Sequence, residues 1–322
     1  MKYIILSIAF LSTLNFYGQN DNLSLKLINQ KHLMNLPSAS GVEIIENNIY
    51  VIGDDSPYLY KLNYDFNILE KYPLTGNDST VNNRVPKEIK ADFESMATYK
   101  SKDGSIMLAV LSSGSQELTP DTIHIFALSE KKLIASKNVR PLFELIREKA
   151  GFTKEDEINI EAMAIGQHKV YLMQRGNNNL NILVEINRRE FFKYIFNEGI
   201  SLPEINVKSF SLPEFENTIS GFSGACMLED ESGILFTASL EKSENAYEDG
   251  EILGSYVGLM KFMGVSNPQI KTNMLKHEGQ NVKTKLEGIC IKSISEKTYQ
   301  LVAVSDMDDG TSKIYNLSLT IK

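Results

Sequence analysis

The chain has 322 residues, 42% of them hydrophobic, and a formal net charge of −8. A chain of this length can bury a large core. Nucleic-acid binding is excluded, because it needs clustered Lys and Arg side chains and the sequence contains no such run. An acidic surface attracts cations instead, so we expect a globular protein with an anionic site.

The first residues have the pattern of a secretory signal. Lys2 precedes an apolar run over residues 4–10, and a small residue, Gly18, stands near the end of the segment at Gln19. The run is too short to span a bilayer, so we expect no transmembrane segment. We predict a signal peptide over residues 1–19 and a single domain over residues 20–322, in an exported monomer that is periplasmic or secreted. The alternative is a buried first strand.

A short segment recurs five times in the rest of the chain. The clearest copy is the segment Leu-Glu-Gly-Ile at 286–289, followed by an apolar strand that ends at Asp306. Short strands that repeat at this length predict a β-propeller, in which no blade can bury its faces alone. The residues that align in the five copies, 54 to 67 positions apart, are Ser40, Glu94, Glu161, Ser223 and Glu287.

Other strands follow from alternating or continuous apolar runs. In the first half of the chain they are predicted at 23–28, 58–62, 68–72, 123–128 and 132–135. A helix is predicted next, because Pro141 stands near its start, Leu142 and Ile146 have helical spacing, and Gly151 ends it.

The second half repeats the pattern, with strands predicted at 180–186, 256–262 and 270–275. The third repeat contains two candidates for its outer strand, residues 191–195 and residues 205–210, and the sequence leaves both open.

The last repeat has room before Lys322 for only three strands, the last of them over residues 313–319. Blades commonly have four strands, so the N-terminal segment 23–36 can supply the missing outer strand. We therefore predict an all-β fold, a five-bladed β-propeller whose ring is closed by an N-terminal strand that completes the last blade. Six blades are the alternative.

The long connections are predicted to gather at one mouth of the channel. Residues 76–91 and 138–159 enter first strands, and residues 241–254 join a second strand to a third. In an up-and-down blade these links open on the same face. Loops on one end of a rigid scaffold are where binding sites usually lie.

The aligned residues predict a metal site. Glu94, Glu161 and Glu287 should converge near the axis with Ser40 and Ser223. Carboxylates held together repel each other unless a proton or a cation intervenes, and hard oxygen ligands favour Ca²⁺. The alternative is that each Glu accepts hydrogen bonds from backbone amides of the next blade and locks the ring. Both interpretations remain open.

The second strands end at the same mouth. We predict that Asp54, Asp55, Gln174 and Glu241 line a ligand site there, and that Arg175 and Asp306 act in catalysis. Arg175 has two possible roles. Its planar fork can clamp a phosphate or carboxylate, or it can form a salt bridge to a ring Glu, which acidic neighbours favour.

The two cysteines, Cys226 and Cys290, occupy equivalent positions in the last two repeats. Export permits a disulfide, but neighbouring inner strands can hold the two residues too far apart for one. We expect two buried thiols.

The repeated Glu-Gly-Ile type segments with acids at strand ends resemble exported bacterial β-propellers of the phytase-like and esterase-like type. The chain also resembles an uncharacterised group of exported Bacteroidetes propellers. Its layout is similar to the five-bladed calcium-activated nucleotidases (apyrases), in which acidic residues that open the inner strands surround a central Ca²⁺. Glu94, Glu161 and Glu287 match those acidic positions, whereas Ser40 and Ser223 depart from them. The similarity to apyrases is carried by residues 41–55, 222–241 with Tyr247 and Gly254, and 286–289.

Two functions are expected. In the first, a Ca²⁺ held by Glu94, Glu161 and Glu287 polarises a phosphoryl or ester oxygen while Arg175 offsets charge, in a hydrolase. The alternative is a non-catalytic propeller that binds a small ligand, a polymer or an extracytoplasmic protein partner. The sequence contains no recognisable pair of nucleophile and base, which favours the alternative.

Overall fold

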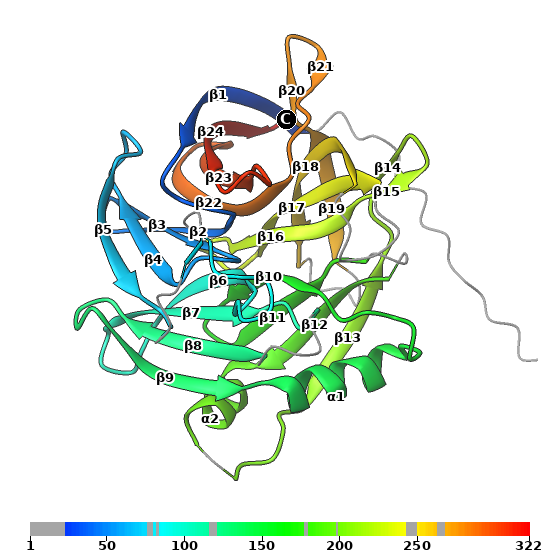
Figure 1. The fold of residues 1–322 in the computed structure, drawn as a ribbon. Helices are drawn as coiled ribbons and strands as arrows, with labels where there is room; N and C mark the ends of the chain where they lie inside the picture. The colour runs from blue at the N-terminus through cyan, green and yellow to red at the C-terminus, as the bar shows by residue number, and fades with distance from the viewer. Residues whose placement is uncertain are drawn as a thin grey trace, which may run out of the picture.

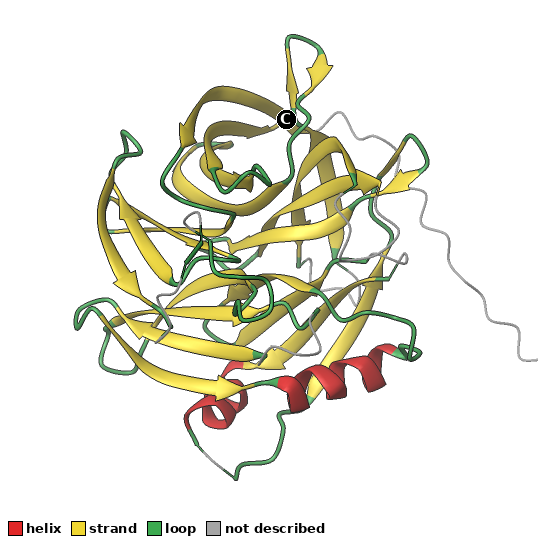
Figure 2. Cartoon of the chain, in the orientation of Figure 1, coloured by secondary structure: helices red, strands yellow, loops and turns green. Residues whose placement is uncertain are grey.

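The computed structural model describes residues 23–75, 80–81, 84–115, 121–176, 180–197, 199–242, 250–262 and 268–322. Five four-stranded antiparallel sheets surround a common axis (Figures 1 and 2). This arrangement confirms the predicted five-bladed β-propeller. The predicted signal peptide at 1–19 lies outside the described residues.

In blades 1 to 4 the strands run outward from the axis in chain order. Blade 1 contains β2 (Ala39–Ile45), β3 (Asn48–Gly53), β4 (Tyr58–Leu62) and β5 (Ile68–Pro73). Blade 2 contains β6 (Phe93–Lys100), β7 (Ile106–Ser112), β8 (Thr122–Ala127) and β9 (Lys132–Asn138). Blade 3 contains β10 (Ile160–Ile165), β11 (Lys169–Gln174), β12 (Asn181–Asn187) and β13 (Ile205–Phe210). Blade 4 contains β16 (Gly221–Met227), β17 (Gly233–Lys242), β18 (Glu251–Lys261) and β19 (Gln269–Met274).

Blade 5 is built from both ends of the described chain. Its strands β22 (Leu286–Ser295), β23 (Thr298–Asp306) and β24 (Ser312–Ile321) are completed by β1 (Leu23–Leu33). β1 pairs antiparallel with the whole length of β24, from Leu23 opposite Ile321 to Leu33 opposite Ser312. The predicted closure of the ring by an N-terminal strand is therefore confirmed.

The apolar core is divided among the spaces between neighbouring blades. Each of five clusters of buried side chains combines residues from two adjacent blades. Between blades 1 and 2, for example, Ile52 and Leu59 belong to the same cluster as Leu108 and Phe126. Because each blade buries its faces against its neighbours, burial of apolar surface stabilises the ring as a whole.

Two helices cover the cluster between blades 2 and 3. The predicted helix is present as α1 (Arg140–Ala150), with Gly151 in the left-handed conformation that ends it. A second helix, α2 (Arg188–Phe196), begins after Asn187, whose side chain accepts two backbone N–H groups. The candidate strand at 191–195 is thus part of a helix, and β13 is the outer strand of blade 3.

Two short hairpins lie in the links that enter blades 4 and 5. They are formed by β14 (Glu214–Phe215) with β15 (Thr218–Ile219), and by β20 (Lys276–His277) with β21 (Gln280–Asn281). With 11 and 9 residues, α1 and α2 are too short to span a membrane, and no other described segment forms a helix suited to that role.

Every innermost strand carries a β-bulge at the aligned residue of the repeat. The pairing between the first two strands of each blade skips one residue, and a bulge of this kind re-aims the side chain of the unpaired residue. The skipped residues are Ser40, Glu94, Glu161, Ser223 and Glu287. The repeat found in the sequence therefore marks a specific backbone irregularity.

The residue after each bulge is small, and this closes the channel. In blade 4, a Cβ atom on Gly224 would lie 2.8 Å from the carbonyl oxygen of Glu287 in blade 5. The axial cavity left at this level is lined by all five inner strands and has a volume of about 10 Å³, which is room for about one water molecule. The axis therefore has no room for a larger ligand at this level. The five small residues are Gly41, Ser95, Ala162, Gly224 and Gly288.

Candidate metal and ligand site at the channel mouth

Three carboxylates that the sequence singled out meet at the axis. Glu94, Glu161 and Glu287 line the same axial cavity, although they come from blades 2, 3 and 5. Each is placed there by the bulge at the start of its inner strand. The expected convergence of the three side chains is present.

The two aligned serines link neighbouring blades. The Ser40 hydroxyl of blade 1 donates to the carbonyl oxygen of Phe93 in blade 2. The Ser223 hydroxyl of blade 4 donates to the carbonyl oxygen of Leu286 in blade 5 at 2.6 Å. Both hydroxyls are buried. In these contacts the two serines, and not the glutamates, join neighbouring blades.

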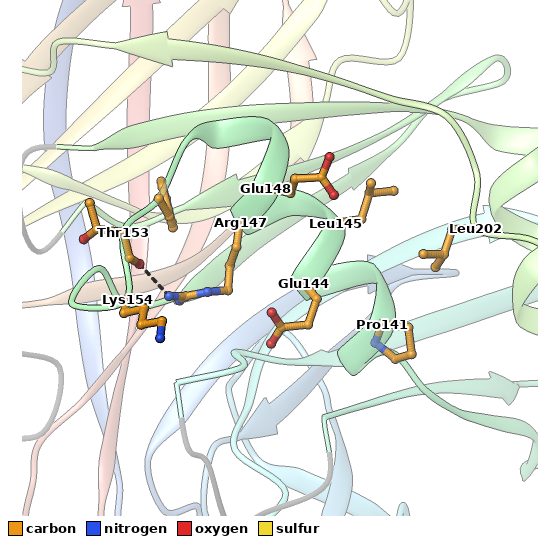
Figure 3. Close-up of a pocket in the computed structure, with 9 residues that line it drawn as sticks. Pro141, Glu144, Leu145, Arg147, Glu148, Thr153, Lys154 and Leu202 are labelled. Carbon is orange, nitrogen blue, oxygen red and sulfur yellow. Dashed lines mark hydrogen bonds between the residues drawn. The ribbon is translucent and has the colours of Figure 1, made fainter.

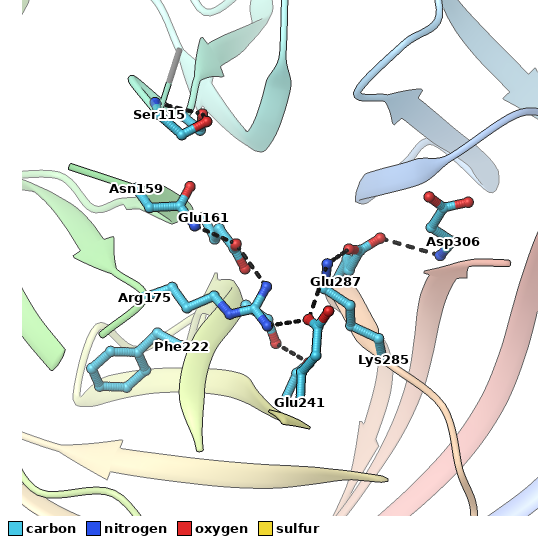
Figure 4. A network of polar contacts seen from close by, with 12 residues as sticks. Ser115, Asn159, Glu161, Arg175, Phe222, Glu241, Lys285, Glu287 and Asp306 are labelled. Atoms are coloured by element: carbon cyan, nitrogen blue, oxygen red, sulfur yellow. Dashed lines mark hydrogen bonds and ion pairs between the residues drawn. The ribbon is translucent and has the colours of Figure 1, made fainter. Parts of the chain in front are cut away.

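Two of the three ring glutamates belong to a chain of ion pairs that crosses blades 3, 4 and 5 (Figure 4). Arg175 donates to Glu161 at 2.9 Å and to Glu241 at 2.5 Å. Lys285 lies 3.6 Å from Glu241 and 3.0 Å from Glu287. We call these five residues the ion-pair chain. Because both terminal nitrogens of Arg175 contact carboxylates, the structure places this guanidinium in the salt-bridge arrangement.

The third ring glutamate belongs to a different group. One carboxylate oxygen from each of Asp54, Asp92 and Glu94 lies within 4.8 Å of the other two. We call these residues the acidic triad. They come from blade 1 and from the start of blade 2. Lys90 donates to Asp54 at 2.5 Å and lies 2.8 Å from Asp92, so one ammonium faces three carboxylates.

Unpartnered polar atoms accompany the acidic triad. Among the described residues, one buried oxygen of Asp54 and the hydroxyl of Ser95 have no hydrogen-bond partner. Ser95 is only 2% exposed and lines the axial cavity beside Glu94. Buried polar atoms usually have a partner, so these two atoms are candidate contacts for a ligand, water or ion.

Burial and mutual repulsion raise the pKa values of several mouth carboxyls. The pKa of Glu94 is raised well above its ordinary value by burial and then by Asp54 and Asp92. Burial likewise raises the pKa of Asp54 to about 6. Burial, together with the charge of Glu287, raises the pKa of Asp306 to about 8. Such shifts concentrate at functional sites, although structural ion-pair networks also produce them.

In the ion-pair chain, nearby cations determine the pKa of Glu241, whereas burial determines the pKa of Glu287. Burial acts to raise the pKa of Glu241, but Lys285 and Arg175 outweigh it and lower that pKa to about 2. Glu287 has one cation close by, and burial together with Glu161 raises its pKa to about 7. The chain therefore holds its middle carboxylate strongly ionised.

Residues 35–319 match the profile of a protein family described as Family of unknown function (DUF6929). The chain belongs to the DUF6929 family. The match covers all four strands of each of blades 1 to 4. It begins just after β1, the strand that completes blade 5. Among curated proteins, none matches this DUF6929 chain.

Solved propeller structures resemble the DUF6929 chain only distantly. One is the α-L-arabinofuranosidase PaAbf62A from Podospora anserina, at 11% identity and a TM-score of 0.47, covering 88% of this chain and 91% of that one. Another is the PQQ-bound aldose sugar dehydrogenase from Streptomyces coelicolor, at 10% identity and a TM-score of 0.44, covering 94% and 100%. A third is virginiamycin B lyase from Staphylococcus aureus, at 11% identity and a TM-score of 0.37, covering 93% and 100%.

The remaining residues predicted at the mouth have different hydrogen-bond and ion-pair partners. Asp55 is buried and pairs with Arg84. Gln174 is also buried, and its amide accepts the backbone N–H of Asn159 and donates to two carbonyl oxygens. Asp306 caps its own turn, accepting the backbone N–H groups of the two residues that follow it. Gln174 therefore holds the loop that enters blade 3.

Sequence reasoning missed Lys90, Asp92 and Lys285. Two of them carry a signal that was available, because Asp92 and Lys285 each precede an aligned glutamate by two positions. The equivalent residue in blade 3, Asn159, donates to Glu161 at 2.8 Å. In blades 3 and 5, a polar residue at this position of the repeat therefore contacts the aligned glutamate.

A larger hollow lies beside α1 and belongs to a different part of the molecule (Figure 3). Its volume is about 490 Å³, and it is lined by Glu144, Phe152 and Leu202 among others. Arg147 donates to the carbonyl oxygens of Thr153 and Asp156 and so holds the turn after the helix. This hollow contains none of the mouth residues.

Both cysteines are unbridged. Cys290 is buried and Cys226 is half-buried, and burial raises the pKa of each thiol. Raised pKa values leave little thiolate, the reactive form.

Proposed function

We propose that the mouth of this propeller binds a divalent cation, with Ca²⁺ preferred, and that the cation is used to hold a polar ligand outside the cytoplasm. The observation that carries the proposal is the acidic triad, which brings oxygens of Asp54, Asp92 and Glu94 within 4.8 Å of one another. The sequence pattern at 1–19 supports the extracytoplasmic part of the proposal.

The oxygens of the triad lie close enough together for one Ca²⁺ to contact all three. This ion binds oxygen at about 2.3–2.6 Å, so one ion can contact oxygens that lie up to roughly 5 Å apart. Mg²⁺ binds at about 2.0–2.1 Å and needs its ligands closer together. The unpartnered oxygen of Asp54 is a ready ligand. Ser95, the buried neighbour of Glu94 in the chain, lines the axial cavity and offers a hydroxyl there.

The proposed ligand set differs from the ring expected from sequence. Glu161 and Glu287 are held by Arg175 and Lys285 in the ion-pair chain. Glu94 forms no ion pair of that kind with a described residue, and its side chain is half-buried. A bound cation is attracted most strongly where carboxylates have the fewest cationic partners. We therefore place the metal near blades 1 and 2 and not in the ring of three glutamates. Ser40 and Ser223, which donate to carbonyl oxygens, are left out of the set.

Calorimetric titration with Ca²⁺ and with Mg²⁺ tests this proposal. We expect Ca²⁺ to bind and to raise the melting temperature, and the double variant Asp92→Asn/Glu94→Gln to weaken binding by at least roughly tenfold. Glu161→Gln is the matched control, since it neutralises a ring glutamate outside the triad. No heat of binding and no change in melting on chelation would rule the site out. A larger loss in the control variant would return the site to the predicted ring.

A metal-assisted phosphoester or ester hydrolase is the second candidate, and the raised pKa values favour it. Asp306, with a pKa of about 8, and Glu287, with a pKa of about 7, would be able to transfer protons near neutral pH. In this candidate Asp306 keeps its predicted catalytic role, while Arg175 positions Glu161 and Glu241. Turnover of nucleotides, phytate or simple esters that requires Ca²⁺ and is lost in Asp306→Asn would support it. Ca²⁺ binding without turnover would leave the non-catalytic binding protein.

A further inference from the structure

The ammonium of Lys90 contacts two of the three carboxylates of the acidic triad. Its nitrogen lies 2.5 Å from one oxygen of Asp54 and 2.8 Å from one oxygen of Asp92. The Lys90 side chain is only 12% exposed, so the contact is largely shielded from solvent. A protein-borne cation is therefore in contact with two of the three residues proposed to hold the metal.

A divalent ion and this ammonium compete for the same oxygens. A metal bound to Asp54 and Asp92 would lie within a few ångströms of the Lys90 nitrogen, and two cations that close in a shielded site repel strongly. The Lys90 ammonium is held to the two carboxylates only by hydrogen bonds and charge attraction. A divalent cation that binds these oxygens more strongly can therefore displace it.

Backbone hydrogen bonds hold the chain on both sides of Lys90, so the exchange needs only a side-chain movement. Before Lys90, the backbone N–H of Val85 donates to the Asp55 carbonyl oxygen at 2.7 Å. After it, the backbone N–H of Ser113 donates to the Asp92 carbonyl oxygen at 2.9 Å. The four-carbon stem of lysine is flexible enough to carry the ammonium into solvent from an anchored backbone.

We propose that Lys90 is a built-in competitor that occupies the cation position until a divalent ion displaces it, and so sets the metal concentration at which the mouth is filled. This inference rests on the proposed metal site. It adds a determinant of affinity and specificity that the acidic triad alone does not provide, because monovalent ions, which carry no more charge than the ammonium, gain little by replacing it.

The test compares Ca²⁺ titrations of the full chain and of Lys90→Met. We expect the variant to bind Ca²⁺ at least roughly tenfold more tightly. Lys61→Met is the matched control, because Lys61 is also partly buried and pairs with a carboxylate, Glu70, in the outer part of blade 1. That control should leave the affinity unchanged.

Each outcome decides one of the two proposals. Equal or weaker Ca²⁺ binding by Lys90→Met overturns the role of Lys90 and leaves the metal site standing. Binding by neither protein removes the metal site, and the competitor with it.

A second measurement uses the unmodified sequence. This matters because Lys90→Met leaves Asp54 and Asp92 without their cation, which can make the variant less stable. An amine-modifying reagent should label Lys90 slowly in the chelated protein and several-fold faster with saturating Ca²⁺, as mass spectrometry of the labelled peptide would report. Labelling of Lys61 should stay constant. Protection of Lys90 that is unchanged by bound Ca²⁺ overturns the proposal.

Discussion

The backbone of Gly288 in blade 5 packs directly on that of Gly41 in blade 1. A Cβ atom on Gly288 would lie 3.0 Å from the Cα atom of Gly41 and 2.9 Å from the backbone nitrogen of Val42. Both glycines follow a bulge at the axis. The first and last blades can therefore approach closely near the axis only because Gly288 has no side chain.

Gly288→Ala is expected to destabilise the propeller by about 1–3 kcal/mol, because the added methyl group meets backbone atoms that cannot move aside. Chemical denaturation of the two proteins measures the difference. Gly166→Ala is the matched control, since the methyl group there meets the flexible end of the Glu231 side chain. Equal effects of the two substitutions would mean that the close approach at the axis is not limiting.

Two buried serines that are one register position apart should behave differently. Ser223→Ala removes a hydroxyl that donates to the Leu286 carbonyl oxygen of the next blade, and should cost about 1–3 kcal/mol. Ser95→Ala removes a hydroxyl without a partner among the described residues, and should change the unfolding free energy by less than about 0.5 kcal/mol. Urea unfolding monitored by circular dichroism tests the pair. A greater cost at Ser95 would show that its hydroxyl holds a tightly bound ligand or water.

Arg175→Met should destabilise the protein by about 3–5 kcal/mol, because it leaves Glu161 and Glu241 buried without their shared cation. Neutralising the partners in the triple variant Arg175→Met/Glu161→Gln/Glu241→Gln should recover most of the loss. Melting temperature and urea midpoint provide the measurement. If Arg175 were a ligand clamp with no structural role, the single variant would melt like the parent protein.

Glu43 should make the protein less stable as the pH rises. Burial raises the pKa of this carboxyl from 4.5 to about 7. The stabilising contribution is therefore present below pH 4.5 and is lost as the pH rises through about 7, amounting to roughly 3 kcal/mol. Glu43→Gln keeps an acceptor for the backbone N–H of Thr98 and removes the titration. The gap in unfolding free energy between variant and parent should grow from pH 5 to pH 8. Glu130→Gln, at an exposed position, should show no such growth.

The fold could be read from the sequence because the propeller repeats one local pattern. The aligned residues Glu94, Glu161 and Glu287 each precede a small residue and an apolar strand, and the same bulge forms wherever this pattern occurs. The helix α2 was missed although Asn187 is a good N-cap, because an apolar run such as 191–195 fits a strand as well as a short helix.

The candidate site was only partly readable. The repeat determined that three glutamates would reach the axis, because register and strand direction are local properties. The pairing of each carboxylate with a cation depends on two things. One is the side chains that come from the links between blades, such as Lys90 and Lys285, and the other is the distances across the ring. Electrostatic pairing acts through space and is independent of sequence separation, so only the tertiary structure could divide the ring into an ion-pair chain and an acidic triad.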